Sequence, residues 1–397
     1  AGQTLLVQST GNAGATLTAV ADFTNSGTIT LQTLDNSGDS NLQVTNGTLT
    51  NANTGVININ PGSAGYHYID ANITNNGTVN FNADGALSKT NGLFTNNSLV
   101  NIADGADVGF GVTGSFTQAA GKLAINGAGT FVMDNDTFNL NGGTITGVPV
   151  LSDSKLVTSP SSTGTGAVST RRASTLSGNI AAGQTVLVQS SSNATATLTA
   201  ANSFTNSGTI TLQTLDNAGD SNLVVTSGTL TNALSGIVNL NPGSAGYRTL
   251  AAELVNNGTL NVATSSTLGR DGAHHVNAGT INVTGGELFV NQTGTTPTFT
   301  NNGTISISPA QALTISGGAL TNFNAGTLSN GTYNIGGTFR FPDADIKTNS
   351  ANVTLSGPSA QILNQSNSNA LTNFASNNAK ASFSVLGFRA AAGSTQP

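Results

Sequence analysis

Short stretches of alternating polar and apolar residues occur along the whole chain. In residues 28–31, 56–59, 78–81 and 304–307 every second side chain is apolar. A period of two residues is typical of a β-strand that buries one face. No segment shows a sustained 3.6-residue apolar period with capping residues, so the pattern predicts an all-β protein.

Glycine and asparagine mark the places where the chain must turn between these strands. Pairs of this kind are Asn76-Gly77, Gly142-Gly143, Ser207-Gly208 and Asn257-Gly258. Both residue types adopt positive φ at little cost, which suits tight turns. We therefore expect many short strands joined by compact turns.

The chain contains a long tandem repeat. The chain from Ala1 aligns without a gap with the chain from Ala182 for about 80 residues, and the run from Asn60 to Tyr66 returns unchanged from Asn241 to Tyr247. The agreement fades near Ile102 and Val283, beyond which only the style of sequence persists. We predict one repeat unit over residues 1–181 and a second unit plus its continuation over residues 182–397, stacked on one axis.

A shorter period lies inside each unit, in which an apolar residue is followed by Thr-Asn or a close variant. It recurs every 21 to 26 residues at Phe23, Leu49, Ile73, Phe94 and Phe116. The second copy repeats it at Phe204, Leu230, Leu254 and His275, and it continues at Phe299 and Leu320. A period of this length indicates one coil of a solenoid.

These features together predict a right-handed parallel β-helix, that is, a β-solenoid in the form of an elongated rod. Apolar side chains should stack inside it, and asparagines at equivalent positions should form ladders of hydrogen-bonded amides. The residues expected to point inward are Ile29, Leu31, Ile57, Ile59, Val79 and Phe81, with Ile210, Leu212, Val238, Leu240, Leu260 and Val262 in the second copy.

The composition agrees with stacked coils and excludes several classes of protein. Only 7% of the residues are charged, where about 25% is usual. Like charges stacked on successive coils would repel one another, whereas Thr, Ser and Asn do not. The net charge of −6 with scattered bases argues against a nucleic-acid partner. No apolar stretch is long enough for a membrane helix, and without cysteine no disulfide framework or thiolate metal site can form.

The sequence style resembles the β-strand repeats of giant bacterial surface proteins. The phrases that carry the resemblance are Thr-Asn-x-Gly-Thr-Ile-Thr-Leu, as at 24–31, and residues 140–147, Leu-Asn-Gly-Gly-Thr-Ile-Thr-Gly. Filamentous-haemagglutinin-like and autotransporter-type adhesins share this style. The resemblance implies the shaft of a secreted or cell-surface adhesin or fibre. Its partners would be glycans, extracellular matrix, neighbouring fibres or further copies of itself.

A repeated acid pair is the first candidate for chemistry. Asp35 and Asp39 lie in a Gly-Asn turn and return as Asp216 and Asp220. Carboxylates and an arginine or lysine on adjacent coils could serve a polysaccharide lyase or hydrolase. Two carboxylates four residues apart could also bind calcium. The interpretation we favour is a turn whose carboxylates cap backbone N–H groups.

Histidines and a second acid pair form two further candidates. His274 and His275 could bind a metal, but His275 aligns with Phe94 and is expected to pack in the core, with His274 exposed. Arg270 and Asp271 precede them and align with Lys89 and Thr90. Asp134 and Asp136 flank Asn135 and are expected in a turn.

Tyrosines and threonines suggest two surface functions. Residues 66–68, Tyr-His-Tyr, with the counterpart Tyr247-Arg248-Thr249, could stack on a sugar, although packing of the tyrosine over its loop is the interpretation we favour. Outward threonine pairs suggest an ice-binding face: Thr28/Thr30, Thr48/Thr50, Thr209/Thr211 and Thr229/Thr231. Asn80, Asn261 and Asn282 should interrupt that array.

We therefore expect a non-enzymatic extracellular spacer that needs no cofactor. No residue is assigned a catalytic, cofactor-binding or metal-ligating role. The alternative is a carbohydrate-active or glycan-binding β-helix, which a convergent cluster of acidic and basic groups in a groove would favour.

Overall fold

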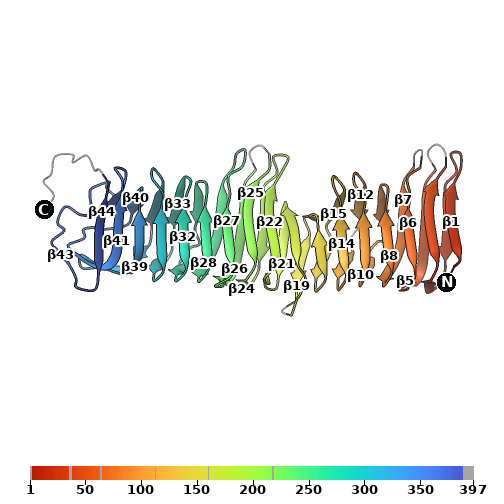
Figure 1. Cartoon of the computed structure of the whole chain (residues 1–397), viewed down its shortest axis with the longest axis horizontal. Helices are drawn as coiled ribbons and strands as arrows, with labels where there is room; N and C mark the ends of the chain where they lie inside the picture. The colour runs from red at the N-terminus through yellow and green to blue at the C-terminus, as the bar shows by residue number, and fades with distance from the viewer. Residues whose placement is uncertain are drawn as a thin grey trace. The chain divides into compact units, whose positions relative to one another are not determined.

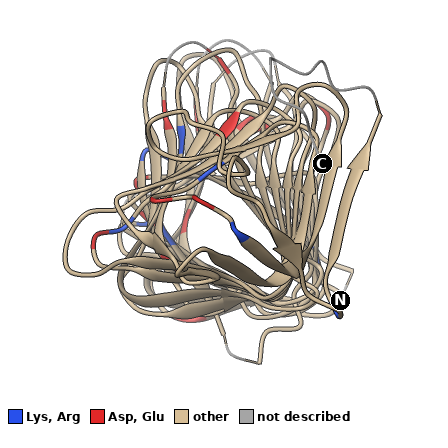
Figure 2. Cartoon of the chain, turned by 90° about the vertical axis from the view of Figure 1, so that its left-hand side faces the viewer, with Lys and Arg blue, Asp and Glu red and all other residues tan. Residues whose placement is uncertain are grey.

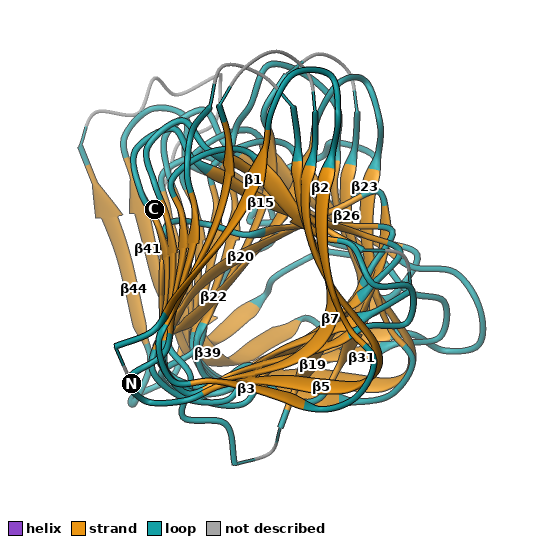
Figure 3. Cartoon of the chain, turned by 90° about the vertical axis from the view of Figure 1, so that its right-hand side faces the viewer, coloured by secondary structure: helices purple, strands orange, loops and turns teal. Residues whose placement is uncertain are grey.

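The computed structural model describes residues 2–34, 38–62, 65–111, 113–159, 161–216 and 219–387. These residues form only β-strands, turns and loops, and Figure 3 draws no helix among them. The chain divides into two compact units, Ala1–Leu187 and Val188–Pro397. The predicted all-β parallel solenoid is confirmed, because strands of successive coils pair in parallel throughout both units.

In unit 1 the strands lie on three faces of the coils. Figure 1 labels many of these strands. The first face is a seven-stranded parallel sheet of β1 (Thr4–Ser9), β4 (Thr28–Thr33), β6 (Val56–Ile59), β8 (Thr78–Phe81), β11 (Leu99–Ile102), β14 (Lys122–Ile125) and β17 (Thr144–Thr146). The other faces contain β2 (Ala15–Ala19), β3 (Phe23–Asn25), β5 (Ser40–Asn51), β7 (His67–Asn75), β9 (Gly85–Leu87), β10 (Leu93–Asn96), β12 (Asp107–Phe110), β13 (Ser115–Gln118), β15 (Thr130–Asp134), β16 (Thr137–Leu140), β18 (Val150–Ser152), β19 (Lys155–Thr158), β20 (Gly166–Arg171) and β21 (Ala173–Ser177).

Unit 2 repeats this arrangement. Strand β22 (Gln184–Ser190) spans the division between the units. Unit 2 then contains β23 (Ala196–Ala200), β24 (Phe204–Asn206), β25 (Thr209–Thr214), β26 (Ser221–Asn232), β27 (Ile237–Leu240), β28 (Arg248–Asn256), β29 (Thr259–Val262), β30 (Ser266–Leu268), β31 (His274–Asn277), β32 (Thr280–Val283), β33 (Glu287–Asn291), β34 (Thr298–Asn301), β35 (Thr304–Ile307), β36 (Ala312–Ser316), β37 (Ala319–Leu320), β38 (Phe323–Asn324), β39 (Thr327–Ile335), β40 (Thr338–Arg340), β41 (Thr348–Ser356), β42 (Gln361–Leu363), β43 (Ser376–Asn377) and β44 (Ser382–Leu386). Strands β38 and β39 form a local antiparallel pair.

The short sequence period corresponds to one coil. Phe23 pairs with Leu49, Leu49 with Ile73, Ile73 with Phe94 and Phe94 with Phe116, each on neighbouring strands. The aligned apolar residues of the second copy pair in the same way, for example Phe204 with Leu230. Residues that look alike in sequence therefore lie directly above one another.

The inward-facing residues are as predicted. All twelve apolar side chains expected in the core, from Ile29 to Val262, are at most 1% exposed. In unit 1 the core also holds a stack of rings, in which Phe116 lies 5.0 Å from Phe94 and 5.5 Å from Phe138, nearly parallel to both. Burial of each such side chain stabilises the fold by about 2 kcal/mol, and stacking of the rings adds to it.

A buried amide ladder follows one corner of the coils, as the recurrent asparagines predict. In unit 1 the Nδ2 of each asparagine donates to the side-chain oxygen of the next at 2.8 to 2.9 Å, through Asn25, Asn51, Asn75, Asn96 and Gln118. In unit 2 the ladder runs through Asn206, Asn232, Asn256, Asn277 and Asn301 at 2.7 to 2.8 Å. Most of these amides also donate to a backbone carbonyl, so the buried polar groups of the ladder are largely satisfied, with the Oδ1 atom of Asn206 as an exception.

Candidate functional site

The repeated acid pair connects neighbouring coils. The Oδ1 atom of Asp39 accepts a hydrogen bond from the backbone N–H of Tyr66 at 2.8 Å, and Asp220 accepts one from Tyr247 at the same distance. Asp216 accepts a hydrogen bond from the N–H of Ser192 in the preceding coil. Asp35 lies outside the described residues. The predicted capping role is therefore confirmed for three of the four carboxylates, and the capped N–H groups belong to adjacent coils.

This arrangement does not favour a shared calcium ion. Asp216 bonds to a coil on one side and Asp220 to the coil on the other, so their bound oxygens point in opposite directions along the unit. Among the described residues no three His, Asp or Glu side chains gather closely enough to hold a metal. Charged residues are few, with 17 acids and 11 bases in the chain, and most of the chain in Figure 2 is tan.

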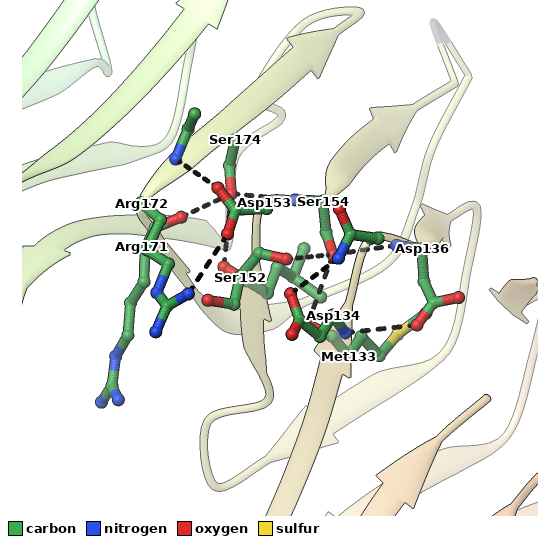
Figure 4. A network of polar contacts seen from close by, with 12 residues as sticks. Met133, Asp134, Asp136, Ser152, Asp153, Ser154, Arg171, Arg172 and Ser174 are labelled. Carbon is green, nitrogen blue, oxygen red and sulfur yellow. Dashed lines mark hydrogen bonds and ion pairs between the residues drawn. The ribbon is translucent and has the colours of Figure 1, made fainter. Parts of the chain in front are cut away.

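Asp134 and Asp136 belong to a polar network at one corner of unit 1, shown in Figure 4. Asp136 is 3% exposed, and its two oxygens accept hydrogen bonds from the backbone N–H groups of Gly114 at 2.7 Å and Asp134 at 3.2 Å. Burial raises the pKa of Asp136 to about 6, although both hydrogen bonds oppose that shift. Asp134 is exposed. The predicted turn is confirmed, with one acid outward and one inward.

The same corner repeats a left-handed residue on successive coils. Asn91, Thr113, Asn135, Asp153 and Arg172 have φ between 48° and 61°. Asn and Asp tolerate this conformation better than other non-glycine residues. Within this column, Asp153 accepts a hydrogen bond from the N–H of Ala173 at 3.0 Å and lies 3.6 Å from the guanidinium of the exposed Arg172. The acids and bases gathered here bind the backbone and one another, which is typical of a structural corner.

The histidine pair separates as predicted. His275 is 1% exposed, and its Nδ1 accepts a hydrogen bond from the backbone N–H of Leu254 at 3.1 Å. Burial lowers the pKa of His275 to about 3, with smaller contributions from His274 and Arg270. His274 is exposed, and its Nδ1 lies 3.0 Å from the hydroxyl of Thr298. The two rings point to opposite sides of β31, so they do not form a common metal site.

The tyrosines differ from the interpretation favoured from sequence. Tyr66 and Tyr247 were expected to pack over their loops, but they are 57% and 70% exposed. The reason is the alternation along β7 and β28, in which the next residue, His67 or Arg248, takes the inward position. Tyr66 instead lies against Tyr68 on the surface, with ring centroids 6.1 Å apart and planes at 29°.

Arg248 is the buried charge that sequence reasoning missed. It is 1% exposed, and its guanidinium donates to the carbonyl oxygens of Asn241, Ala245 and Gly246 and to the hydroxyl of Thr214 at 2.7 to 3.1 Å. Burial lowers the pKa of Arg248, while the charge of Asp220 acts in the opposite direction. The signal was present in the strand alternation, which places position 248 inward.

The outward threonines do not form an unbroken array. Thr30 pairs with Asn58 and Asn58 with Asn80, and Thr211 pairs with Asn239 in the same way. Asn80 donates to Asn58 at 2.9 Å, while Asn282 donates to Asn261 at 3.0 Å. The predicted interruption is confirmed, and the asparagines form a second, surface ladder. Thr211 is an exception among the threonine pairs because it is only 6% exposed.

Unit 2 contains an open groove of about 620 Å³ beside one corner of its coils. Its described lining consists of Gly, Pro, Thr, Ala and Gln residues, with Asp343 as the one acid and no base. A glycosidase or lyase needs at least two ionisable groups that converge on the scissile bond. The groove does not supply them.

Within the part of the chain that the structure describes, no membrane-spanning helix is found. No protein-family model matches the chain, and neither a curated protein nor a solved structure shows significant similarity to it.

Proposed function

We propose that this chain is a repetitive shaft segment of a secreted or cell-surface bacterial adhesin or fibre. It would act as a stiff spacer that also makes weak, multivalent adhesive contacts. The observation that carries the proposal is the ladder of buried amides in each unit, which couples successive coils from Asn25 to Gln118 and from Asn206 to Asn301. In a solenoid, stability is the sum of such nearest-neighbour terms, so further copies lengthen the segment without a new core.

The surface supports the same proposal. Outward positions hold mainly Thr, Asn and Ser, whose side chains bond laterally to the next coil, as Asn261 does to Asn239 at 2.9 Å. A surface of this kind repeats the same weak contacts along the segment. Binding through several copies at once multiplies weak affinities by about 10² to 10⁴.

Attachment of linked copies tests the proposal. The full chain is joined in tandem once, twice and four times, and its binding to glycan arrays and to cell surfaces is measured. We expect binding that rises more steeply than the number of copies. Small-angle X-ray scattering tests the spacer role separately, because the maximum dimension of the particle should grow with each copy. A maximum dimension that stays constant would contradict that role.

A glycan-binding role without catalysis is the second candidate, and the exposed Tyr66, which lies against the half-buried Tyr68, favours it. A catalytic role is weaker because the buried Asp136 already accepts two backbone hydrogen bonds. Incubation with a panel of acidic and neutral polysaccharides distinguishes the two. Release of unsaturated or reducing-end sugars would overturn the non-enzymatic proposal.

A further inference from the structure

The exposed Tyr66 and the half-buried Tyr68 stand beside hydrogen-bonding side chains on one outer face of unit 1. Tyr68 and Asp70 point outward from β7, and β5 places Asn41 beside Tyr68 and Gln43 beside Asp70. Tyr66 precedes the strand and lies against Tyr68. We call Tyr66, Tyr68, Gln43 and Asp70 the tyrosine patch.

The patch is held in place by contacts to its backbone and to Asp70. The backbone of Tyr66 is fixed on both sides, because its N–H donates to Asp39 and its carbonyl accepts from Ser40 at 3.0 Å. Gln43 donates to Asp70 at 3.0 Å, and the ammonium of Lys89 lies 4.0 Å from the same carboxylate. More than half of the Tyr66 surface remains in solvent.

We infer that the tyrosine patch binds one pyranose ring of an uncharged glycan. This inference rests on the adhesive part of the proposed function and assigns it a site. The C–H face of a pyranose packs on an aromatic ring, while its hydroxyls need donors and acceptors at the rim. Asp70 stands two residues beyond Tyr68 on an extended strand, about 7 Å away, which is the breadth of one sugar ring.

Charge selects a neutral sugar over an acidic one. The carboxylates of Asp39 and Asp84 act on the ring of His67 beneath the patch, and Asp70 lies within the patch itself. Lys89 is the base beside the patch, and it is occupied by Asp70 and by the carbonyl of Val44 at 3.0 Å. An acidic sugar would meet net negative charge here.

The second copy supplies a matched comparison. Tyr247 is retained and exposed, but the positions aligned with Tyr68, Gln43 and Asp70 hold Thr249, Val224 and Ala251. Arg270 aligns with Lys89, but its guanidinium donates to the carbonyl of Gly228, whereas Lys89 lies beside the carboxylate of Asp70. The backbone register is the same, since Asn222 pairs with Thr249 as Asn41 pairs with Tyr68. The site therefore belongs to the first copy alone.

The test titrates the full chain with methyl β-glucoside, methyl β-galactoside, methyl N-acetyl-β-glucosaminide and sialyllactose. Saturation-transfer NMR reports which sugar protons touch the protein. The chain has four tyrosines and no tryptophan, so a change in tyrosine fluorescence during the titration reports binding at the patch. We expect millimolar binding of at least one neutral sugar, transfer to its C–H face, and weaker binding of sialyllactose.

Exchange between the copies makes the test specific. Tyr68→Thr introduces the residue that already folds at position 249, and we expect it to weaken binding about tenfold or more. The Tyr68→Thr chain is then given three further substitutions in the second copy: Thr249→Tyr, Val224→Gln and Ala251→Asp. These rebuild the patch at the aligned positions, and binding should return there. An unchanged thermal midpoint shows that each variant is folded.

Three results would overturn the inference: no neutral sugar bound, equal binding by the Tyr68→Thr chain, or tighter binding of sialyllactose. Cell attachment distinguishes a failure of this inference from a failure of the proposed function. If Tyr68→Thr attaches to cells as the wild-type chain does, the site is wrong and adhesion stands. If neither chain attaches at any copy number, the adhesive function itself is wrong.

Discussion

Two loops of identical sequence, 60–66 and 241–247, are anchored by different buried side chains. The guanidinium of Arg248 donates hydrogen bonds to three carbonyls of loop 241–247 and to the hydroxyl of Thr214. His67 occupies the same inward position in the first copy, is 2% exposed, and bonds to the carbonyl of Asn60. Its Nδ1 is buried without a partner among the described residues.

The difference shows that a repeat conserves backbone register more strictly than side-chain chemistry. Both anchors follow an exposed tyrosine, and both lie under a loop whose tyrosine N–H is capped by an aspartate. Arg248 keeps its charge at any ordinary pH. His67 is a neutral ring, because burial lowers its pKa. The two copies should therefore respond differently to substitution and to acid.

The largest effect should come from a charge in the core, where the two copies are alike. Ile57→Asp and Val238→Asp replace side chains that are at most 1% exposed. Each should lower the free energy of unfolding of its unit by more than about 4 kcal/mol, because an unpaired carboxylate is buried. Hydrogen exchange resolved by residue measures each unit separately. Thr30→Ser, an outward change in the same sheet, serves as the control and should cost less than about 0.5 kcal/mol.

Removal of the buried guanidinium should distinguish the copies most clearly. Arg248→Met leaves the carbonyls of Asn241, Ala245 and Gly246 without their donor, at a cost of about 3 kcal/mol. We expect faster hydrogen exchange in loop 241–247 and none of this change in unit 1. His67→Met should cost less, because it removes one loop contact. Equal losses in the two loops would contradict the anchoring role of Arg248.

The amide ladder should respond equally in both copies. Asn75→Ala removes a donor to Asn96 and to the carbonyl of Leu99, and an acceptor for Asn51. The cost should be about 2 kcal/mol, and Asn256→Ala should match it. Urea denaturation measures the loss. Asn80→Ala in the surface ladder is the control, since water can replace its bonds, and a loss as large as that of Asn75→Ala would show that burial of the ladder is unimportant.

Acid should separate the copies through His67. A histidine whose folded pKa is lowered binds its proton more readily in the unfolded chain. Its contribution is therefore complete above pH 6.5 and is lost as the pH falls. We expect His67→Arg, which copies position 248, to make the exchange of loop 60–66 less sensitive to acid. Unfolding followed between pH 7 and pH 5 measures this.

His275 should make the wider fold of unit 2 acid-sensitive. Its pKa of about 3 means that its contribution declines progressively as the pH falls from 6.5 towards 3. His275→Phe, which copies Phe94, should flatten that decline. Asp136, with its pKa raised to about 6, acts in the opposite direction in unit 1 and favours the fold as the pH falls from 6 towards 4. A steeper acid loss in the His275→Phe chain would contradict this assignment.

The smallest effect should come from calcium. The acid pair of the second copy bonds to coils on opposite sides, so neither copy is expected to gain a site. Thermal unfolding in chelator and in millimolar calcium should give the same midpoint. A large upward shift would reveal binding to the folded chain, most plainly at Asp39, Asp216 and Asp220.

The strands, the coil period, most of the inward residues and the amide ladder could be predicted from the amino-acid sequence. Phe23, Leu49 and Ile73 were recognisable as stacked partners because a solenoid places each repeat directly on the last. The fold was needed to show which backbone N–H groups Asp39 and Asp220 cap, because each of these bonds joins residues 27 positions apart on neighbouring coils and leaves no local pattern in the chain. The inward position of Arg248 and the outward position of Tyr66 follow the strand alternation, but the hydrogen bonds that hold the guanidinium are visible only in the folded chain.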